Sequence, residues 1–94
     1  MNRAIAETLL ERELTSVLEL GHERLVRQVG SEPIVKVVQG TDGKRYLVEI
    51  SAYWDGRENG PVRLIAVIDD GGWKAFVLPL TADCVVDETW KARA

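Results

Sequence analysis

Two adjacent carboxylates, Asp69 and Asp70, begin the segment Asp-Asp-Gly-Gly-Trp between two apolar runs. Paired carboxylates suit a hard cation, and Asp83 and Asp87 follow nearby. A calcium loop, however, spaces its oxygen ligands over about twelve residues, and adjacent side chains of a strand point to opposite faces. Asp and Gly are also what a tight turn requires, because Gly reaches positive φ freely and Asp tolerates it. The segment therefore favours a hairpin turn over a metal site.

The chain has one histidine, His22, and one cysteine, Cys84. A zinc site built from both would need two carboxylates as well, and no ligand spacing typical of zinc is present. Asp83 precedes Cys84, and a neighbouring carboxylate raises a thiol pKa and disfavours the nucleophilic thiolate. We predict that Cys84 is a small buried hydrophobe and that His22 is a solvated helix residue. The sequence thus predicts no catalytic residue, no metal site, no cofactor and no enzyme activity.

Aromatic side chains form a second group of candidates near the ends of the expected strands. They are either cross-strand pairs in a core or interface, or the lining of a small pocket at the sheet edge. Basic flanks that an RNA-binding platform needs are missing. The group comprises Tyr53, Trp54, Trp73 and Phe76, and the alternative ligand pocket consists of Trp54, Trp73, Asp69 and Asp70.

Composition narrows the class of protein. The 94 residues fit one domain, and 46% hydrophobic with 29% charged residues is the balance of an ordinary globular chain. The 12 Lys and Arg are scattered among 15 acids, for a net charge of −3, so a nucleic acid partner is disfavoured. A single cysteine, a charged N-terminal stretch and the lack of a long apolar run predict a cytoplasmic protein with no membrane partner.

The first thirty residues have a helical period. Apolar side chains recur there at spacings of three and four: Ala6, Leu10, Leu14, Val17 and Leu18. Asn2 is placed to act as the N-cap. Gly21 leaves two possibilities open, because either one helix continues to about Gln28 or a short second helix follows a break. Gly30 and Pro33 then end any helix.

After Pro33 the apolar period changes to two, which predicts strands at 34–39, 45–54, 62–69 and 73–80 and a very short fifth at 84–86. Asp42-Gly43 is typical of a tight hairpin turn. Short connections make neighbouring strands antiparallel. We therefore predict a single α+β domain over 1–94, with residues 1–30 helical, 34–86 in an antiparallel sheet and 87–94 a tail. In this fold an N-terminal helix, or helix pair, packs on a four- to five-stranded β-meander in two layers.

One helical layer covers only one face of such a sheet. If Tyr46, Val48, Ile50 and Leu64 face the helix, four other apolar residues face away: Leu47, Tyr53, Ile65 and Val67. An exposed face of this kind often marks an interface, although the tail with Trp90 is an alternative cover. Burial of a few large side chains at ~1.5–3 kcal/mol each is enough to drive dimerisation.

The segment Ile-Ser-Ala-Tyr-Trp-Asp, followed by "VRLIAVIDDGGWKAFVLPLT", resembles a small bacterial domain family of uncharacterised function with a similar acid-acid-Gly-Gly-aromatic hairpin. The resemblance covers roughly residues 48–82 and involves mainly turn and core positions. It implies a stand-alone bacterial α+β domain with no assigned catalysis, and it assigns no site residue.

Three functions remain after these arguments. The first is a non-enzymatic protein-interaction domain that binds a protein partner or associates as a homodimer. The second is a small-ligand-binding or enzyme-accessory module with a pocket near Trp54 and Trp73. The third is an immunity or antitoxin-like protein, which the small size and acidic charge fit equally well.

Overall fold

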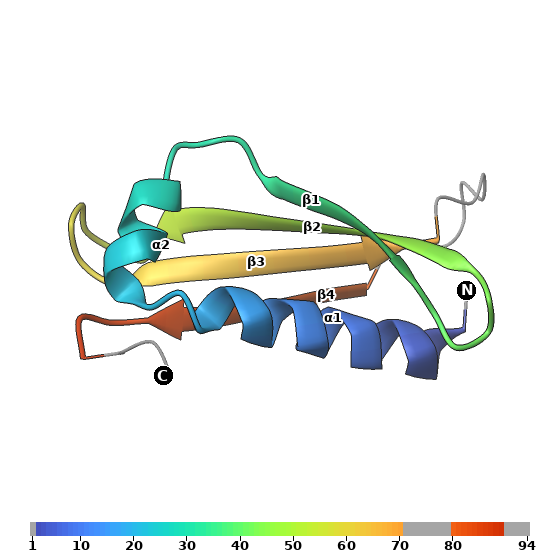
Figure 1. Cartoon of the computed structure of the whole chain (residues 1–94). Coiled ribbons are helices and arrows are strands. Elements are labelled where there is room, and N and C mark those ends of the chain that lie inside the picture. Colours follow the sequence, from blue (N-terminus) through green and yellow to red (C-terminus); the bar gives the residue numbers. More distant parts are fainter. Residues whose placement is uncertain (1, 71–79, 90–94) are drawn as a thin grey trace.

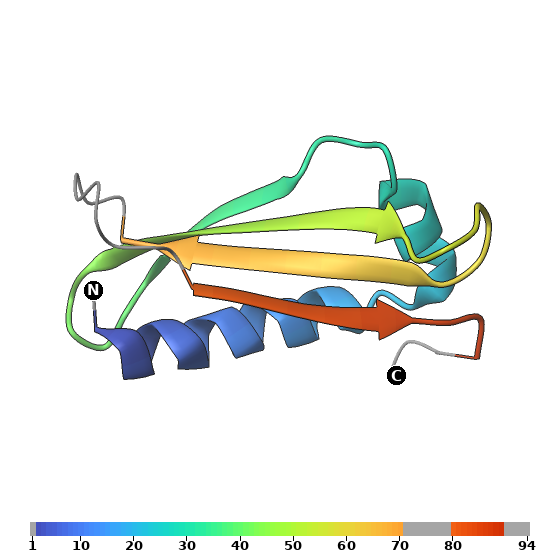
Figure 2. The same cartoon turned by 180° about the vertical axis from the view of Figure 1, so that it is seen from behind.

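The computed structural model describes residues 2–70 and 80–89 of the chain. Two helices and four strands follow one another along it: α1 (Arg3–Leu18), α2 (His22–Gln28), β1 (Ile34–Gln39), β2 (Arg45–Trp54), β3 (Val62–Asp69) and β4 (Leu80–Val86). The strands form one antiparallel sheet in the order β1-β2-β3-β4. Both helices lie on one side of it, and on the opposite side no described helix lies in front of the strands (Figures 1 and 2). The predicted α+β meander is confirmed.

The helical segment consists of two helices. The side chain of Asn2 accepts a hydrogen bond from the N–H of Ile5 at 3.1 Å, so the predicted N-cap is confirmed. Gly21 has φ of 84°, a left-handed conformation that strains any residue with a Cβ, and the helix breaks there. The second helix is only seven residues long, and its fully buried Leu25 anchors it on the sheet. The break at Gly21 therefore resolves the alternative that the sequence left open.

The first three strands have the predicted bounds, but the fourth does not. β4 begins at Leu80 and runs to Val86, so it extends well beyond the short strand predicted at 84–86. β3 is paired on one side with β2 and on the other with β4, whose Leu80 lies opposite Ile68. Apart from Leu80, the strand predicted at 73–80 lies outside the described residues. Gly71 and Gly72 of the tight turn that we predicted after β3 also lie outside the described residues.

The core lies between α1 and the inner face of the sheet. We call the side chains of β2 and β3 that point toward α1 the inner face of the sheet. Every one of the following is at most 7% exposed: Tyr46, Val48, Ile50 and Ala52 of β2, and Val62, Leu64, Ala66 and Ile68 of β3. From α1 the buried residues are Ala6, Leu9, Leu10, Leu14 and Val17. The residues of β2 and β3 that we predicted to face the helix are therefore confirmed to be buried.

The turn between β1 and β2 is fixed by a buried aromatic ring. The hydroxyl of Tyr46 donates to Asp42 Oδ2 at 2.7 Å, and Asp42 Oδ1 accepts from the N–H of Lys44 at 3.1 Å. Gly40 closes this arrangement, because a Cβ there would lie 2.8 Å from the Tyr46 ring and 2.6 Å from Asp42 Oδ1. The hydrogen bond from Tyr46 lowers the pKa of Asp42, while burial and the same carboxylate raise the pKa of Tyr46. The ionised form of Asp42 thus stabilises the hairpin.

This hydrogen bond predicts an acid-dependent contribution to stability. Because the pKa of Asp42 is lowered in the folded state, its contribution is complete above the ordinary value of 3.8 and is lost as pH falls through the lower folded value. We expect Tyr46→Phe to be less stable than the wild type at pH 7, and the difference to narrow toward pH 3. Urea unfolding of both proteins across this pH range measures the difference in unfolding free energy. A difference that stays constant with pH would contradict the role of ionised Asp42 as the acceptor for Tyr46.

Candidate functional site

The outer face of the sheet carries an apolar surface on all four strands. We call the strand side chains that point away from the helices the outer face of the sheet. Its apolar members are Val35 and Val37 of β1, Leu47 and Tyr53 of β2, Ile65 and Val67 of β3, and Val85 of β4. The most exposed are Val37 (61%), Val35 (59%) and Tyr53 (52%). No described helix covers them, so these side chains remain open to water or to a partner.

The register places these side chains beside one another. Val37 of β1 pairs with Leu47 of β2, and Glu49 of β2 lies between Val35 and Val67 on the two flanking strands. Cross-strand partners have Cβ atoms only ~4.5–5.5 Å apart, and Val37 with Leu47 is the directly opposite apolar pair of this face. Leu47 with Val67 and Tyr53 with Ile65 are diagonal neighbours at ~7–8 Å, which is still within reach of long and aromatic side chains. Glu49 is exposed and introduces one carboxylate into an otherwise apolar row. This charge limits nonspecific association of the face.

One end of the outer face is fixed by Arg63. Its guanidinium forms ion pairs with Asp55, at 3.0 Å, and with Asp83. The hydrogen bond that Arg63 donates to Asp55 is the main cause of the raised pKa of Arg63. Arg63 lies between Tyr53 of β2 and Val85 of β4 in the register, so the ion pairs order the surface around these two apolar side chains.

The predicted interaction residues all lie on the outer face, but the alternative ligand pocket does not form as one site. Trp54 is the partner of Val62 at the start of β3, whereas Asp69 is the partner of Leu47 at the other end of that strand. Seven residues of strand at ~3.3 Å each separate the two ends by ~23 Å. Asp70 follows Asp69, and Trp73 lies outside the described residues. The prediction of one pocket from Trp54 and the acidic pair is therefore wrong.

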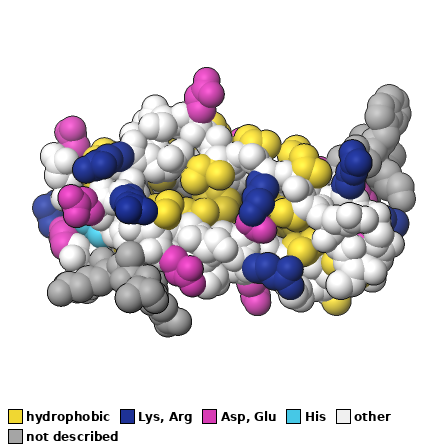
Figure 3. Space-filling model, viewed as in Figure 1, with side chains coloured by type: hydrophobic (Ala, Val, Ile, Leu, Met, Phe, Trp, Pro, Cys, Tyr) yellow, Lys and Arg dark blue, Asp and Glu magenta, His cyan; other side chains and the backbone are white. Residues whose placement is uncertain are grey.

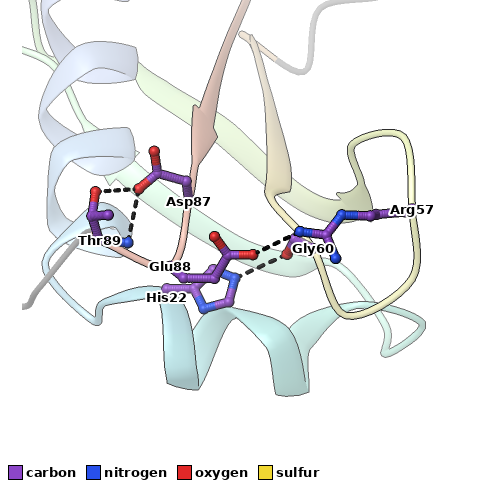
Figure 4. A network of polar contacts seen from close by, with 6 residues as sticks. All are labelled: His22, Arg57, Gly60, Asp87, Glu88 and Thr89. Atoms are coloured by element: carbon purple, nitrogen blue, oxygen red, sulfur yellow. Dashed lines mark hydrogen bonds and ion pairs between the residues drawn. The ribbon is translucent and has the colours of Figure 1, made fainter.

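His22 is not the solvated residue that we predicted. Its Nε2 lies 2.9 Å from the carbonyl oxygen of Gly60 in the β2–β3 connection (Figure 4). A carbonyl oxygen only accepts, so Nε2 carries the hydrogen and donates it. The ion pair of Arg57 with Glu88, at 3.2 Å, lies in the same region of the molecule. His22 thus attaches the start of α2 to the loop between two strands, which is a structural role.

Cys84 behaves as the sequence predicted. It is half-buried, lies opposite Leu64 in the register and packs against the core. Burial, and then the charge of Asp83, raises its pKa, so its thiol form is favoured. Over residues 2–70 and 80–89, no three His, Cys, Asp or Glu side chains come together in a way that would hold a metal ion.

Charge on the helical side of the molecule is dispersed. Figure 3 shows single basic and acidic side chains around apolar patches across the middle of this face. One such pair joins Lys36 of β1 to Glu13 of α1 at 3.2 Å. A phosphate-binding surface would gather basic side chains, and this face does not. Among the described helices, neither has the length and apolar character needed to cross a membrane.

Comparison with protein-family models, with curated proteins and with solved structures found no match for this chain. The resemblance to a small bacterial domain family therefore stays a prediction.

The sequence reasoning missed three apolar residues of the outer face: Val35, Val37 and Val85. The signal for the first two was available, because the predicted strand 34–39 alternates and its odd positions had to face away from the helix once it paired with β2. Val85 was missed because β4 was placed at the wrong residues. The face of the sheet on which Val85 lies depends on the pairing of β3 with Leu80–Val86, and the apolar pattern alone does not reveal this pairing.

The position of Glu49 leads to a test of the outer face. Glu49→Val would join Val35 to Val67 in one uninterrupted apolar row, so we expect more self-association at equal concentration and little change in unfolding free energy. Sedimentation velocity measures the association, and urea unfolding measures the stability. The matched control is Glu58→Val, which removes an exposed carboxylate from the β2–β3 connection. Equal behaviour of the two variants would contradict the role of Glu49.

Proposed function

We propose that this protein is a non-enzymatic interaction domain that binds a second copy of itself or a protein partner through the outer face. The observation that carries the proposal is the exposure of apolar side chains on the same face of all four strands, with Val37 opposite Leu47 and with Val67 diagonal to Leu47 on the next strand. Monomeric proteins expose few contiguous apolar patches of this kind, and those that occur are often functional.

The size of the sheet agrees with an interface. Ten residues of β2 at ~3.3 Å each give a length of about 33 Å, and four strands at ~4.8 Å give a width of about 19 Å. The other three strands are shorter than β2, so the 31 strand residues give one outer face of about 490 Å², and two such faces together bury about 1,000 Å². Specific protein interfaces begin at about this area.

Charge would set the orientation of a partner on this surface. Arg45 and Glu49 lie on either side of Leu47 along β2, on the same face, and both are exposed. Within the described part of the chain, neither makes an ion pair or a side-chain hydrogen bond. A partner strand or surface with the opposite order of charges would therefore meet a cation at one end and an anion at the other. Such complementarity favours one orientation over others.

Substitution of the centre of the face tests the proposal. We expect Ile65→Lys combined with Val67→Lys to abolish association and to leave the fold intact, because both side chains are half-exposed and lysine keeps its charge in water. Thr81→Lys, which adds a lysine to an exposed β4 position of the same face, is the control for stability. The control for association is Thr15→Lys, which adds a lysine to an exposed position of α1 away from this face. Sedimentation over a range of concentrations measures self-association, and circular dichroism checks the fold.

Two results would contradict the proposal. A wild-type protein that remains monomeric at high concentration rejects the self-associating form. A lysine variant that unfolds at much lower urea than Thr81→Lys would show that the face is covered by the protein's own chain and is not an interface.

A further inference from the structure

We propose that the open edge of β2 at residues 51–54 binds an extended peptide segment of a partner protein as an added strand. β1 pairs with β2 only from Arg45 to Ile50, although β2 continues for four more residues to Trp54. Among the described strands, only β3 lies beside these four residues of β2. This site is separate from the outer face, and the inference does not rest on the proposed function.

Two turn hydrogen bonds reveal which main-chain groups point to the open edge. The N–H of Gly40 donates to the carbonyl of Lys44 at 2.8 Å, and the N–H of Asp55 donates to the carbonyl of Pro61 at 2.8 Å. Hydrogen-bonded pairs alternate in an antiparallel ladder, so even-numbered residues of β2 direct their N–H and C=O toward β1, and odd-numbered residues toward β3. Both turns give this same assignment. The main-chain groups of Ala52 and Trp54 therefore face the open edge.

The chain itself explains why the edge is open. β1 joins the ladder with β2 only at Ile34, because residues 29–33 before it form the connection from α2. The connection from α2 lies away from the end of β2 (Figure 1). An open cleft of about 490 Å³ lies between them. It is lined by Val29, Gly30, Ser31 and Pro33 from the connection and by residues 51–54 of β2.

The neighbouring edge of β1 is protected, whereas this part of β2 is not. Lys36 of β1 points toward the helical side and forms an ion pair with Glu13, and an inward-pointing charge on an edge strand opposes pairing with another chain. The four residues 51–54 include no charge and no proline. This part of the edge therefore lacks the charge and the proline that oppose strand addition on other edge strands.

The geometry defines the chemistry of the segment that fits. An antiparallel strand beside β2 would exchange hydrogen bonds with Ala52 and with Trp54, two residues apart. Its side chains opposite these two residues enter the cleft, where Val29 and the half-buried Trp54 offer apolar surface. The side chain between them lies next to exposed Tyr53. The partner is therefore an extended segment of at least four residues with apolar side chains at alternate positions.

Amide hydrogen exchange of the free full-length protein tests the open edge directly. We expect the N–H groups of Ala52 and Trp54 to exchange much faster than that of Tyr53, which faces β3, and than that of Ile50, which faces β1. The comparison is internal, because all four residues belong to one strand. Protection of Ala52 and Trp54 equal to that of Tyr53 would show that the edge is closed, and would overturn the proposal.

Peptide binding tests whether an extended segment pairs with this edge of β2. Decapeptides selected from a random display library on the immobilised wild-type protein should protect the Ala52 and Trp54 amides when they bind. N-methylation of the selected peptide should weaken binding at alternate residues and have little effect at the others. Ala52→Pro removes the N–H at the edge without breaking a ladder bond to β3, and should lower affinity at least about tenfold.

The N-methylation series uses the unaltered protein, so it holds even if Ala52→Pro does not fold. Ile65→Lys with Val67→Lys should leave peptide binding unchanged, which separates this site from the outer face. A library that yields no binder at this edge, or binding that no N-methyl group affects, would overturn the proposal.

Discussion

The burial of alternate side chains of β2 and β3 under α1 is the constraint on which the rest of the structure depends. Tyr46, Leu64, Ala66 and Ile68 are fully buried, and their strand neighbours point the other way. A shift of register by one residue would move this whole set into water, which makes the observed register strongly preferred. The same constraint decides what remains outside, because each inner residue fixes the side of the next one along the strand.

The position of α1 explains why β1 differs from the other strands. α1 packs mainly over β3, β4 and β2. β1 is held instead by its ladder with β2, by the Asp42–Tyr46 turn and by the ion pair from Lys36 to Glu13. Its valines on the outer face are accordingly the most exposed large apolar side chains of the described residues. A strand held mainly from one side forms the margin of the sheet, and the surface that we propose for partners includes this margin.

Local patterns predicted those features of the fold that depend on local chemistry. Asn2 was identified as the N-cap because its amide oxygen reaches the first free N–H groups, and the strands 34–39, 45–54 and 62–69 followed from a period of two. Only the end of β4 was predicted, as a short strand at 84–86, because Thr81 and Asp83 alternate with small side chains and the apolar contrast along the rest of the strand is weak. Only its pairing with β3 makes it a strand, and pairing is a long-range property.

The same distinction holds for the candidate sites. The outer face was predicted as a consequence of alternation, and Ile65 and Val67 lie there. The bond of His22 to Gly60 joins residues 38 positions apart, and no spacing in the sequence indicates it. The ligand pocket failed for a related reason, since Trp54 and Asp69 are near in the chain but belong to opposite ends of the β2–β3 ladder.

The outer face and the open edge adjoin at Tyr53, yet they recognise partners by different physics. The face offers side chains, so binding there depends on which apolar residues a partner presents and on the charges of Arg45 and Glu49. The edge offers main-chain groups, whose hydrogen bonds are available to almost any extended sequence without proline. A strand added at the edge would also lie beside Tyr53 and widen the outer face by one strand. Occupation of the edge would therefore enlarge the apolar surface available to a second partner, which couples the two sites through geometry without any change in the fold.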